Sequence, residues 1–276
     1  MNTDDRHALI LEQLTAAGQV EVSELRETLG VSDMTIRRDL MRLEEDGALR
    51  RVRGGATRAV GGSYEPPFLV RARQRTREKE AIARAVTAQI LNGETVLLDG
   101  GTTGLAVARQ LLQTVTTVCP LSMRAASVLV TSASVRILLP GGFVRPGEQS
   151  IIGADAVAAI HQHVFDVFVM TASGVTARTG VTEWNEEDAT VKRAGLANAR
   201  RCIVACDSSK LGHSAFAKVA AINDVDLIVT DAGITPATQN ELEQLGTRVQ
   251  VVPDAPEDAF TETAGVGAAL DGAALR

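Results

Sequence analysis

Seven arginines gather between Arg37 and Arg58, where the sequence holds only four acidic residues. Thr35, Arg38 and Arg42 recur at spacings of three and four, which places them on one face of a helix, with Arg37 beside them. The planar guanidinium of arginine binds guanine O6 and N7, or a phosphate, through two hydrogen bonds. The segment could therefore recognise DNA. Its excess of positive charge is local, because the whole chain has a formal net charge of −6.

Two short helices joined by a turn at Gly30 would position these side chains. Ser23 is the predicted N-cap of the first helix and Ser32 that of the second. The layout is typical of a helix-turn-helix whose second helix lies in the DNA major groove, although a solvated helix hairpin has the same pattern. The apolar residues that would face inward are Leu25, Leu29, Ile36, Leu40 and Leu43.

A glycine-rich segment follows the second helix, which we expect to end at Gly47. Two short extended stretches within residues 48–56 would form a wing around a turn. That wing places Arg50, Arg51 and Arg53 near the sugar–phosphate backbone, where they would add non-specific affinity for DNA.

The run from Val31 to Ala56 closely resembles the winged helix-turn-helix of the DeoR family of bacterial transcription regulators, with its Val-Ser-x-x-Thr-Ile-Arg-Arg-Asp-Leu core and a wing ending Gly-Gly-Ala. The wing departs slightly from the family pattern at Val52–Arg53, where a histidine is frequent. The resemblance implies a double-stranded DNA operator as partner. The predicted DNA-binding residues are Ser32, Thr35, Arg37, Arg38, Arg42, Arg50, Arg51 and Arg53.

A second candidate site is the glycine-rich loop of Leu98–Gly104, which follows an apolar strand and opens a helix. Gly100 and Gly101 would let the backbone approach an anion, and the hydroxyl and amide groups of Thr102 and Thr103 would donate to it at the helix N-terminus. A tight turn capped by threonine has the same sequence. The loop lacks both the P-loop ending and the Gly-x-Gly-x-x-Gly spacing, so it does not indicate a nucleotide.

Strands and helices alternate from residue 77 onward, which predicts an α/β domain with a parallel, helix-covered sheet. The predicted strands are Thr95–Leu98, Thr116–Cys119, Val135–Leu139, Val164–Met170, Cys202–Cys206, Leu227–Thr230 and Arg248–Val252. The predicted helices are Glu78–Leu91, Thr103–Leu112, Arg124–Leu129, Ala154–His161, Ala189–Ala199 and Gln239–Leu245.

The chain is expected to divide into a DNA-binding domain (residues 1–57), a linker (58–76), an effector-binding and oligomerisation domain (77–253) and a mobile tail (254–276). Residues 1–80 carry no net charge, so the remainder carries the whole formal charge of −6. Four arginines between Arg71 and Arg77 either extend the DNA footprint or begin a solvated helix.

Three cysteines, an odd number, do not indicate a disulfide framework. Cys202 and Cys206 would share one side of a strand, as a redox pair, as half a metal site or as two small buried side chains. No histidine motif supports a metal, and we expect no cofactor. With no run of 18 apolar residues and no signal-peptide pattern, we expect a soluble, cytoplasmic protein that does not contact a membrane.

Five further segments are similar to the effector domain of the DeoR family, so the resemblance extends to about residue 253. They are Asp99–Thr103; Pro140–Arg145 with Ser150–Gly153; Ser173–Val175 with Gly180–Thr182 and Val191–Arg193; Asp207–Gly212; and Val229–Asp231. The resemblance implies a domain related in fold to ribose-5-phosphate isomerase, which in this family binds a phosphorylated sugar or similar metabolite without converting it.

Carried over residue by residue, the resemblance implies that Gly101, Thr102 and Thr103 bind the phosphate. It also implies that Lys210 reaches the ligand or pairs with a carboxylate. Asp99, Glu187 and Lys192 are the candidates for the sugar side. Simpler interpretations remain for three of these residues. Lys210 could be a surface lysine, Asp99 could cap its own loop, and Lys192 could form a helix ion pair with Asp188.

The segment Cys119–Met123 departs from the family, which usually has a Thr-Asn pair there. The loss of that amide predicts a different effector, unless Ser122 takes the role.

Two functions follow from these patterns. The first is a transcriptional regulator, most often a repressor in this family, that acts on carbohydrate genes under the control of a phosphorylated sugar. The second is a sugar-phosphate isomerase with an added DNA-binding arm. Isomerisation needs paired acid/base groups. The glutamate that follows the aspartate in the isomerase motif is missing after Asp155, so we expect that this protein is not an enzyme. A homodimer or homotetramer is expected because one winged helix reads only a few base pairs.

Overall fold

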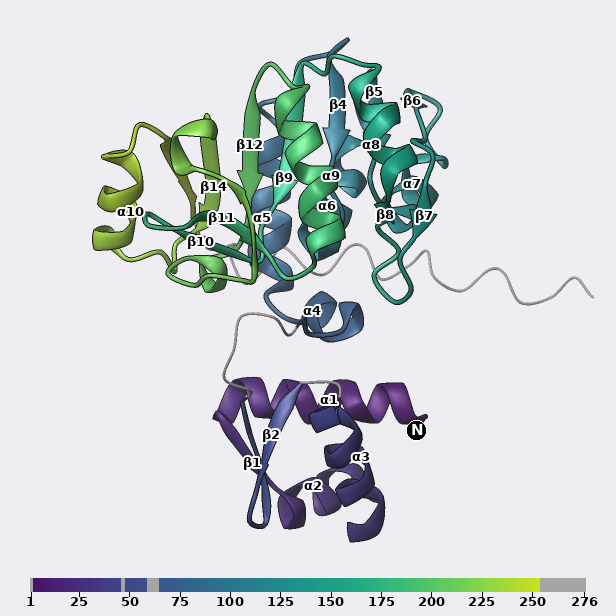
Figure 1. Ribbon diagram of the computed structural model, residues 1–276, viewed down its shortest axis with the longest axis vertical. Helices are drawn as coiled ribbons and strands as arrows, with labels where there is room; N and C mark the ends of the chain where they lie inside the picture. The colour runs from purple at the N-terminus through teal and green to yellow at the C-terminus, as the bar shows by residue number, and fades with distance from the viewer. Residues whose placement is uncertain (1, 46–47, 59–64, 254–276) are drawn as a thin grey trace, which may run out of the picture.

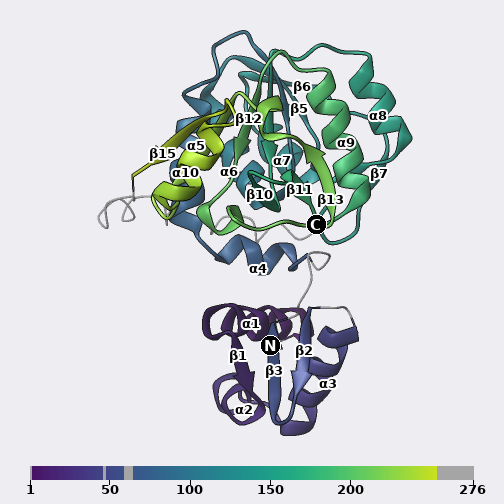
Figure 2. The same ribbon diagram turned by 60° about the vertical axis from the view of Figure 1, so that its left-hand side comes forward.

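The structure is a computed structural model that describes residues 2–45, 48–58 and 65–253 (Figure 1). The expected mobile tail at 254–276 and the expected helix end at Gly47 lie outside these residues. The described chain forms a small N-terminal part and a larger α/β part, with the short helix α4 (Phe68–Arg73) between them in both views (Figures 1 and 2).

The N-terminal part is a winged helix-turn-helix, as the sequence predicts. Its helices are α1 (Thr3–Ala17), α2 (Val22–Leu29) and α3 (Asp33–Glu45). Its strands are β1 (Gln19–Glu21), β2 (Leu49–Val52) and β3 (Gly55–Arg58), which form an antiparallel sheet in the order β1-β3-β2. The predicted inward-facing residues Leu25, Ile36, Leu40 and Leu43 are all buried in one hydrophobic cluster.

The two predicted helix caps have different outcomes. The Ser32 hydroxyl accepts a hydrogen bond from the Thr35 amide at 3.2 Å, so Ser32 caps α3. The prediction for Ser23 is wrong, because strand β1 runs directly into α2 and Ser23 lies inside that helix. The first amide of α2, that of Val22, donates instead to the Gly54 carbonyl in the wing turn at 2.9 Å.

A buried ion pair joins α1 to α3. The Arg6 guanidinium donates to both carboxylate oxygens of Asp39, and the His7 ring nitrogen Nε2 lies 3.1 Å from the same carboxylate. The Asp39 side chain is only 5% exposed. Its pKa lies below the ordinary value, because hydrogen bonds and charge from Arg6 and His7 outweigh the opposing effect of burial. Asp39 thus holds α3 against α1.

The larger part contains a seven-stranded parallel sheet in the order β15-β14-β12-β9-β4-β5-β6. In chain order, its strands are β4 (Thr95–Leu98), β5 (Thr116–Pro120), β6 (Val135–Ile137), β9 (Val167–Thr171), β12 (Cys202–Ala205), β14 (Leu227–Asp231) and β15 (Arg248–Val252). Each predicted strand is present, with bounds shifted by a few residues at most. The predicted α/β fold class is therefore confirmed.

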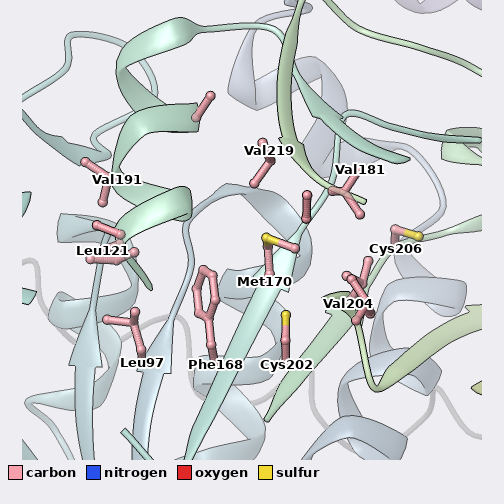
Figure 3. Close-up of a cluster of buried hydrophobic side chains, with 14 of the residues drawn as sticks. Leu97, Leu121, Phe168, Met170, Val181, Val191, Cys202, Val204, Cys206 and Val219 are labelled. Carbon is pink, nitrogen blue, oxygen red and sulfur yellow. The ribbon is translucent and has the colours of Figure 1, made fainter. Parts of the chain in front are cut away.

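Two hydrophobic clusters cover the two faces of the sheet, because alternate residues of each buried strand point to opposite sides. One face packs on α5 (Thr76–Thr87), α6 (Gly101–Gln110) and α7 (Met123–Leu129). The other packs on α8 (Ala154–His161), α9 (Glu186–Ala197) and α10 (Pro236–Glu243). Figure 3 shows part of this second cluster around Phe168 and Met170.

Several short elements were not predicted. A three-stranded antiparallel sheet of β10 (Gly174–Thr176), β11 (Gly180–Glu183) and β13 (Ala217–Ala220) covers part of the second face, and β7 (Phe143–Val144) pairs with β8 (Ile151–Ile152). Within the described ranges, 3₁₀ turns at Leu111–Gln113, Ser208–Lys210 and Ile222–Asp224 connect elements. Helix α4 lies within the expected linker at 58–76.

All three cysteines are free and buried. Cys202 and Cys206 pack among hydrophobic side chains (Figure 3), and burial raises the pKa of the Cys119 thiol to about 12. In the described part of the chain, no group of three or more His, Cys, Asp or Glu residues could hold a metal ion. The interpretation as small buried side chains therefore holds.

We predict that Asp39→Asn destabilises the N-terminal part by about 3 kcal/mol, because the substitution leaves the Arg6 charge buried without its partner. Hydrogen exchange of the α1 and α3 amides in the full chain would measure this. The control is Asp33→Asn in the same helix, whose side chain is 52% exposed and should change stability by less than about 1 kcal/mol. Equal protection in both variants would contradict the role given to Asp39.

Candidate DNA-binding surface and effector cavity

The candidate recognition surface combines α3 with the wing. Arg37, Arg38 and Arg42 are exposed on α3, on the side opposite the buried Ile36 and Leu40. In the wing, the exposed side chains of Arg50, Arg51 and Arg53 flank a turn at Gly54, whose φ of +86° is one that glycine adopts without strain. The Arg51 amide donates to the Glu44 carboxylate at 2.7 Å, which fixes the wing against the end of α3.

A second site is a cavity at the carboxyl ends of strands β4 and β9, where ligands bind in open α/β sheets. It has a free volume of about 60 Å³, room for a few water molecules. Its wall includes the start of α6, the Trp184 side chain and residues from α4, α5 and α9. Of the predicted effector residues, those that line it are Asp99, Gly101, Thr102, Thr103, Lys192 and Lys210.

The loop before α6 presents backbone amides to this cavity. Gly100 is the N-cap residue of α6 and supplies no side-chain hydrogen bond, so no cap occupies the first amides of the helix. Gly101 has a φ of +75°, and a Cβ there would lie 3.8 Å from the Arg71 guanidinium. The helix N-terminus is therefore open to an anionic group beside Thr102 and Thr103.

A buried lysine organises the floor of the cavity. The Lys192 ammonium lies 2.9 Å from the Asp99 carboxylate, contacts the Glu183 carboxylate and donates to the Thr171 carbonyl. Burial opposes a charge there, but Asp99 and Glu183 raise the pKa of Lys192 above its ordinary value. The same pairing holds the pKa of Glu183 below its usual range in spite of burial.

Both carboxylate oxygens of Asp99 have partners within the protein. One carboxylate oxygen accepts from the Gly100 amide at 2.7 Å, and the other accepts from the Thr171 amide and hydroxyl. Lys192 completes its partners. Asp99 and Lys192 thus lie in the cavity wall with their polar atoms already engaged.

Two arginines on the opposite wall share three carboxylates. Arg71 pairs with Glu65 and Glu148, and Arg145 pairs with Glu65 and Asp188. Burial outweighs the nearby arginines and raises the pKa of Glu148, and in the same way it raises the pKa of Asp188 to about 6.

Lys210 differs from the other cations of the cavity. Its ammonium lies 4.9 Å from the centre of the Trp184 ring and forms no ion pair with any residue in the described ranges. Burial lowers its pKa below the ordinary value. Lys79 also lines the cavity, but its ammonium donates to the Arg71 and Gln74 carbonyls.

Glu187, the remaining predicted effector residue, lies outside the cavity. Asn185 caps α9, so Glu187 falls on the exposed side of the first turn while Asp188 faces inward and binds Arg145. The expected helix ion pair between Asp188 and Lys192 is absent from the described contacts, because each has other partners.

The arginines between Arg71 and Arg77 differ in their surroundings. Arg71 is buried in the cavity wall, and Arg75 lies 3.7 Å from Asp207 and 3.5 Å from Asp231, so both face the α/β part. Arg77 is exposed in the first turn of α5, as expected for a solvated helix start. Arg145, Glu148 and Trp184 were not singled out. Of these, only Arg145 lies in a segment that carried the family resemblance.

Two other candidate positions have structural roles. Ser122 caps α7 through the Arg124 amide at 3.2 Å and does not line the cavity. Asp155 is an exposed acid in the first turn of α8, also outside the cavity, as expected for a residue that favours the helix dipole.

Two family models match the chain. Residues 6–60 match a DeoR-like helix-turn-helix domain, and residues 74–232 match a DeoR C terminal sensor domain. The chain belongs to the DeoR family. It is therefore a DNA-binding transcriptional regulator and not an enzyme.

Curated relatives span nearly the whole chain. The putative aga operon transcriptional repressor of Escherichia coli O157:H7 is 32% identical over 91% of this chain and 94% of its own length. The glycerol-3-phosphate regulon repressor of Escherichia coli K12 is 35% identical over 84% of this chain and 92% of its own length.

Among solved structures, ribose 5-phosphate isomerase A of Methanocaldococcus jannaschii matches 48% of this chain and 53% of that chain, with 16% identity and a TM-score of 0.37. Within the described residues of the regulator, no helix is both long enough and apolar enough to cross a membrane.

We predict that Arg37→Ala and Arg38→Ala each weaken operator affinity by about 1–3 kcal/mol, because each removes a guanidinium from the recognition surface. Fluorescence anisotropy on an operator selected from random duplexes would measure the loss. Arg109→Ala, which removes an exposed arginine of α6, is the control. Unchanged affinity in both recognition-helix variants would refute the assignment of α3.

We also predict that wild-type protein loses stability between about pH 4 and pH 6, relative to Asp188→Asn. Burial raises the pKa of Asp188 from its ordinary value of 3.8 to about 6 on folding, so the folded state binds the proton more tightly and stability falls as the proton is released. The difference is on the order of 1–3 kcal/mol. Urea unfolding at several pH values checks this, with the exposed Asp155→Asn as control; parallel pH profiles for all three proteins would contradict it.

Proposed function

We propose that this regulator represses genes of carbohydrate metabolism and that a phosphorylated sugar or polyol, bound in the cavity, releases it from its operator. The names of two relatives, repressors of an aga operon and of a glycerol-3-phosphate regulon, support this reading. The match to a sensor domain supports control by a small ligand.

The single observation that carries the proposal is the position of Lys210. Arg71, Arg145 and Lys192 each pair with two carboxylates, whereas Lys210 has none among the described residues. It lines the same cavity as the open N-terminus of α6 and the hydroxyls of Thr102 and Thr103. A dianionic phosphate is the group that suits such donors, since charge-assisted hydrogen bonds and the helix dipole act together.

The rest of the cavity suits a polyol more than an apolar ligand. Carboxylates and hydroxyl groups line the rest of the wall, and Trp184 is the one aromatic side chain among the described residues of the wall. Carboxylate oxygens accept hydrogen bonds from sugar hydroxyls, and an aromatic face packs against the C–H groups of a sugar.

We further propose that the regulator works as a homodimer or homotetramer. One winged helix covers only a few base pairs, so useful specificity needs two or more copies. Their operators would then hold repeated half-sites separated by whole turns of DNA.

The proposal predicts that phosphorylated sugars or glycerol 3-phosphate stabilise the wild type, and that their unphosphorylated parents do not. A ligand at 100 times its dissociation constant should add about 2.7 kcal/mol to the free energy of unfolding. A thermal-shift screen measures this, and the same ligand should weaken operator binding in an anisotropy assay. Lys210→Ala should lose the response.

Lys218→Ala is the matched control for the screen, because Lys218 is exposed on β13 and lies outside the cavity. Stabilisation by parent sugars alone, or an undiminished response in Lys210→Ala, would refute the phosphate assignment while leaving DNA binding intact.

A further inference from the structure

We propose that Glu65 serves as an internal anion that holds Arg71 and Arg145 in the ligand-free regulator, and that the effector releases DNA by displacing this carboxylate. The inference rests on the proposed function of the cavity. It adds the residue that links ligand binding to the DNA-binding part.

Glu65 bridges two guanidinium groups that are distant in sequence. One carboxylate oxygen lies 3.0 Å from Arg71, at the end of α4, and the other lies 2.8 Å from Arg145, beyond β7. The Glu65 side chain is 18% exposed and lines the cavity. A phosphate or carboxylate ligand would make the same two contacts, because arginine binds both groups through paired hydrogen bonds.

The cavity has more acids than the arginines can neutralise. Glu65, Glu148 and Asp188 surround Arg71 and Arg145, and each guanidinium already pairs with two of these carboxylates. An incoming anion that binds both guanidinium groups therefore competes with the carboxylates for them. Glu148 and Asp188 are the more buried, with side chains 8% and 11% exposed, so Glu65 is the carboxylate that can leave most readily.

Helix α4 connects this contact to the DNA-binding part. Val70 is 2% exposed and belongs to the hydrophobic cluster of the winged helix-turn-helix, whereas the next residue, Arg71, lies in the cavity wall. The Arg71 guanidinium also donates to the Pro66 carbonyl at 2.8 Å, which ties the segment before α4 to its end. Figure 1 shows α4 between α1 and the larger part, and α1 contacts it.

Two consequences follow when the ligand takes the place of Glu65. The segment 65–67 loses its anchor on Arg145, and Arg71 changes partner. Because Val70 and Arg71 are adjacent in one turn of helix, a change at Arg71 shifts the surface on which the winged helix-turn-helix packs. The effector therefore alters the placement of the recognition helix without contacting it.

The test is Glu65→Gln in the full chain without effector. The variant should bind inorganic phosphate more tightly, since the competing carboxylate is gone, and should bind operator more weakly, by about fivefold or more for each equilibrium. Loss of a negative charge would by itself strengthen DNA binding, so weaker operator binding excludes a simple charge effect, and the two changes together are what the displacement account predicts. Phosphate binding is measured by calorimetry and operator binding by anisotropy.

Glu94→Gln is the matched control. Glu94 also pairs with an arginine, Arg201, at 2.7 Å, and its side chain is 17% exposed, but it lies outside the cavity. This variant should bind both phosphate and operator as the wild type does. Glu65→Asp, which keeps a carboxylate, should restore part of the wild-type behaviour.

The outcomes separate this inference from the function on which it rests. Wild-type phosphate and operator affinities in Glu65→Gln, with sugar phosphates still stabilising the wild type, would overturn the inference alone. Weaker operator binding without tighter phosphate binding would make Glu65 a structural support and would also overturn it. Failure of every phosphorylated compound to bind the wild type would remove the proposed function first.

Discussion

The cavity depends on the ion pairs that the buried Lys192 ammonium forms with two carboxylates. The ammonium joins Asp99 at the end of β4, Glu183 on β11 and the Thr171 carbonyl at the end of β9. Helix α9, the parallel sheet and the small antiparallel sheet are thus fixed around one charge. Removing any partner of a buried ion pair costs far more than the pair contributes, because a charge is then left in a poorly hydrated site. This constraint keeps Asp99 in place, and Asp99 in turn orders the Gly100 amide and the start of α6.

The cations of the cavity divide into two kinds. Lys192 is satisfied within the protein and shapes the site, whereas Lys210 contacts the Trp184 ring and has no carboxylate partner among the described residues. Arg71 and Arg145 are intermediate, because their partner Glu65 comes from the segment that leads to the DNA-binding part. A cavity with this division can hold its shape without ligand and still respond to one. In the mechanism that we propose, the response reaches α3 through the short helix α4, whose successive residues Val70 and Arg71 face different partners.

Much of the architecture could be predicted from the sequence, because it follows from local patterns. Buried parallel strands appear as apolar runs, and α3 shows itself through Ile36 and Leu40 at helical spacing. The Gly-Gly-Thr-Thr loop, which lines the cavity, could also be predicted because it is a local sequence pattern. The contacts of Arg71, Arg145 and Trp184 could not be predicted, since they arise where segments 77 to 113 residues apart meet. Asp188 was overlooked in favour of Glu187 because the facing residue of α9 depends on where Asn185 caps the helix.

We infer that the cavity and the DNA-binding surface are energetically coupled. Thermodynamic linkage requires that such coupling act equally in both directions. Trp184 is the single tryptophan of the chain, and the centre of its ring lies 4.9 Å from the Lys210 ammonium. Its fluorescence is therefore the signal to follow in a ligand titration. The decisive measurement is the dissociation constant of a stabilising sugar phosphate with and without saturating operator DNA. Our account predicts that operator raises this constant by the same factor by which the ligand weakens operator binding. An identical dissociation constant in the two titrations would contradict it.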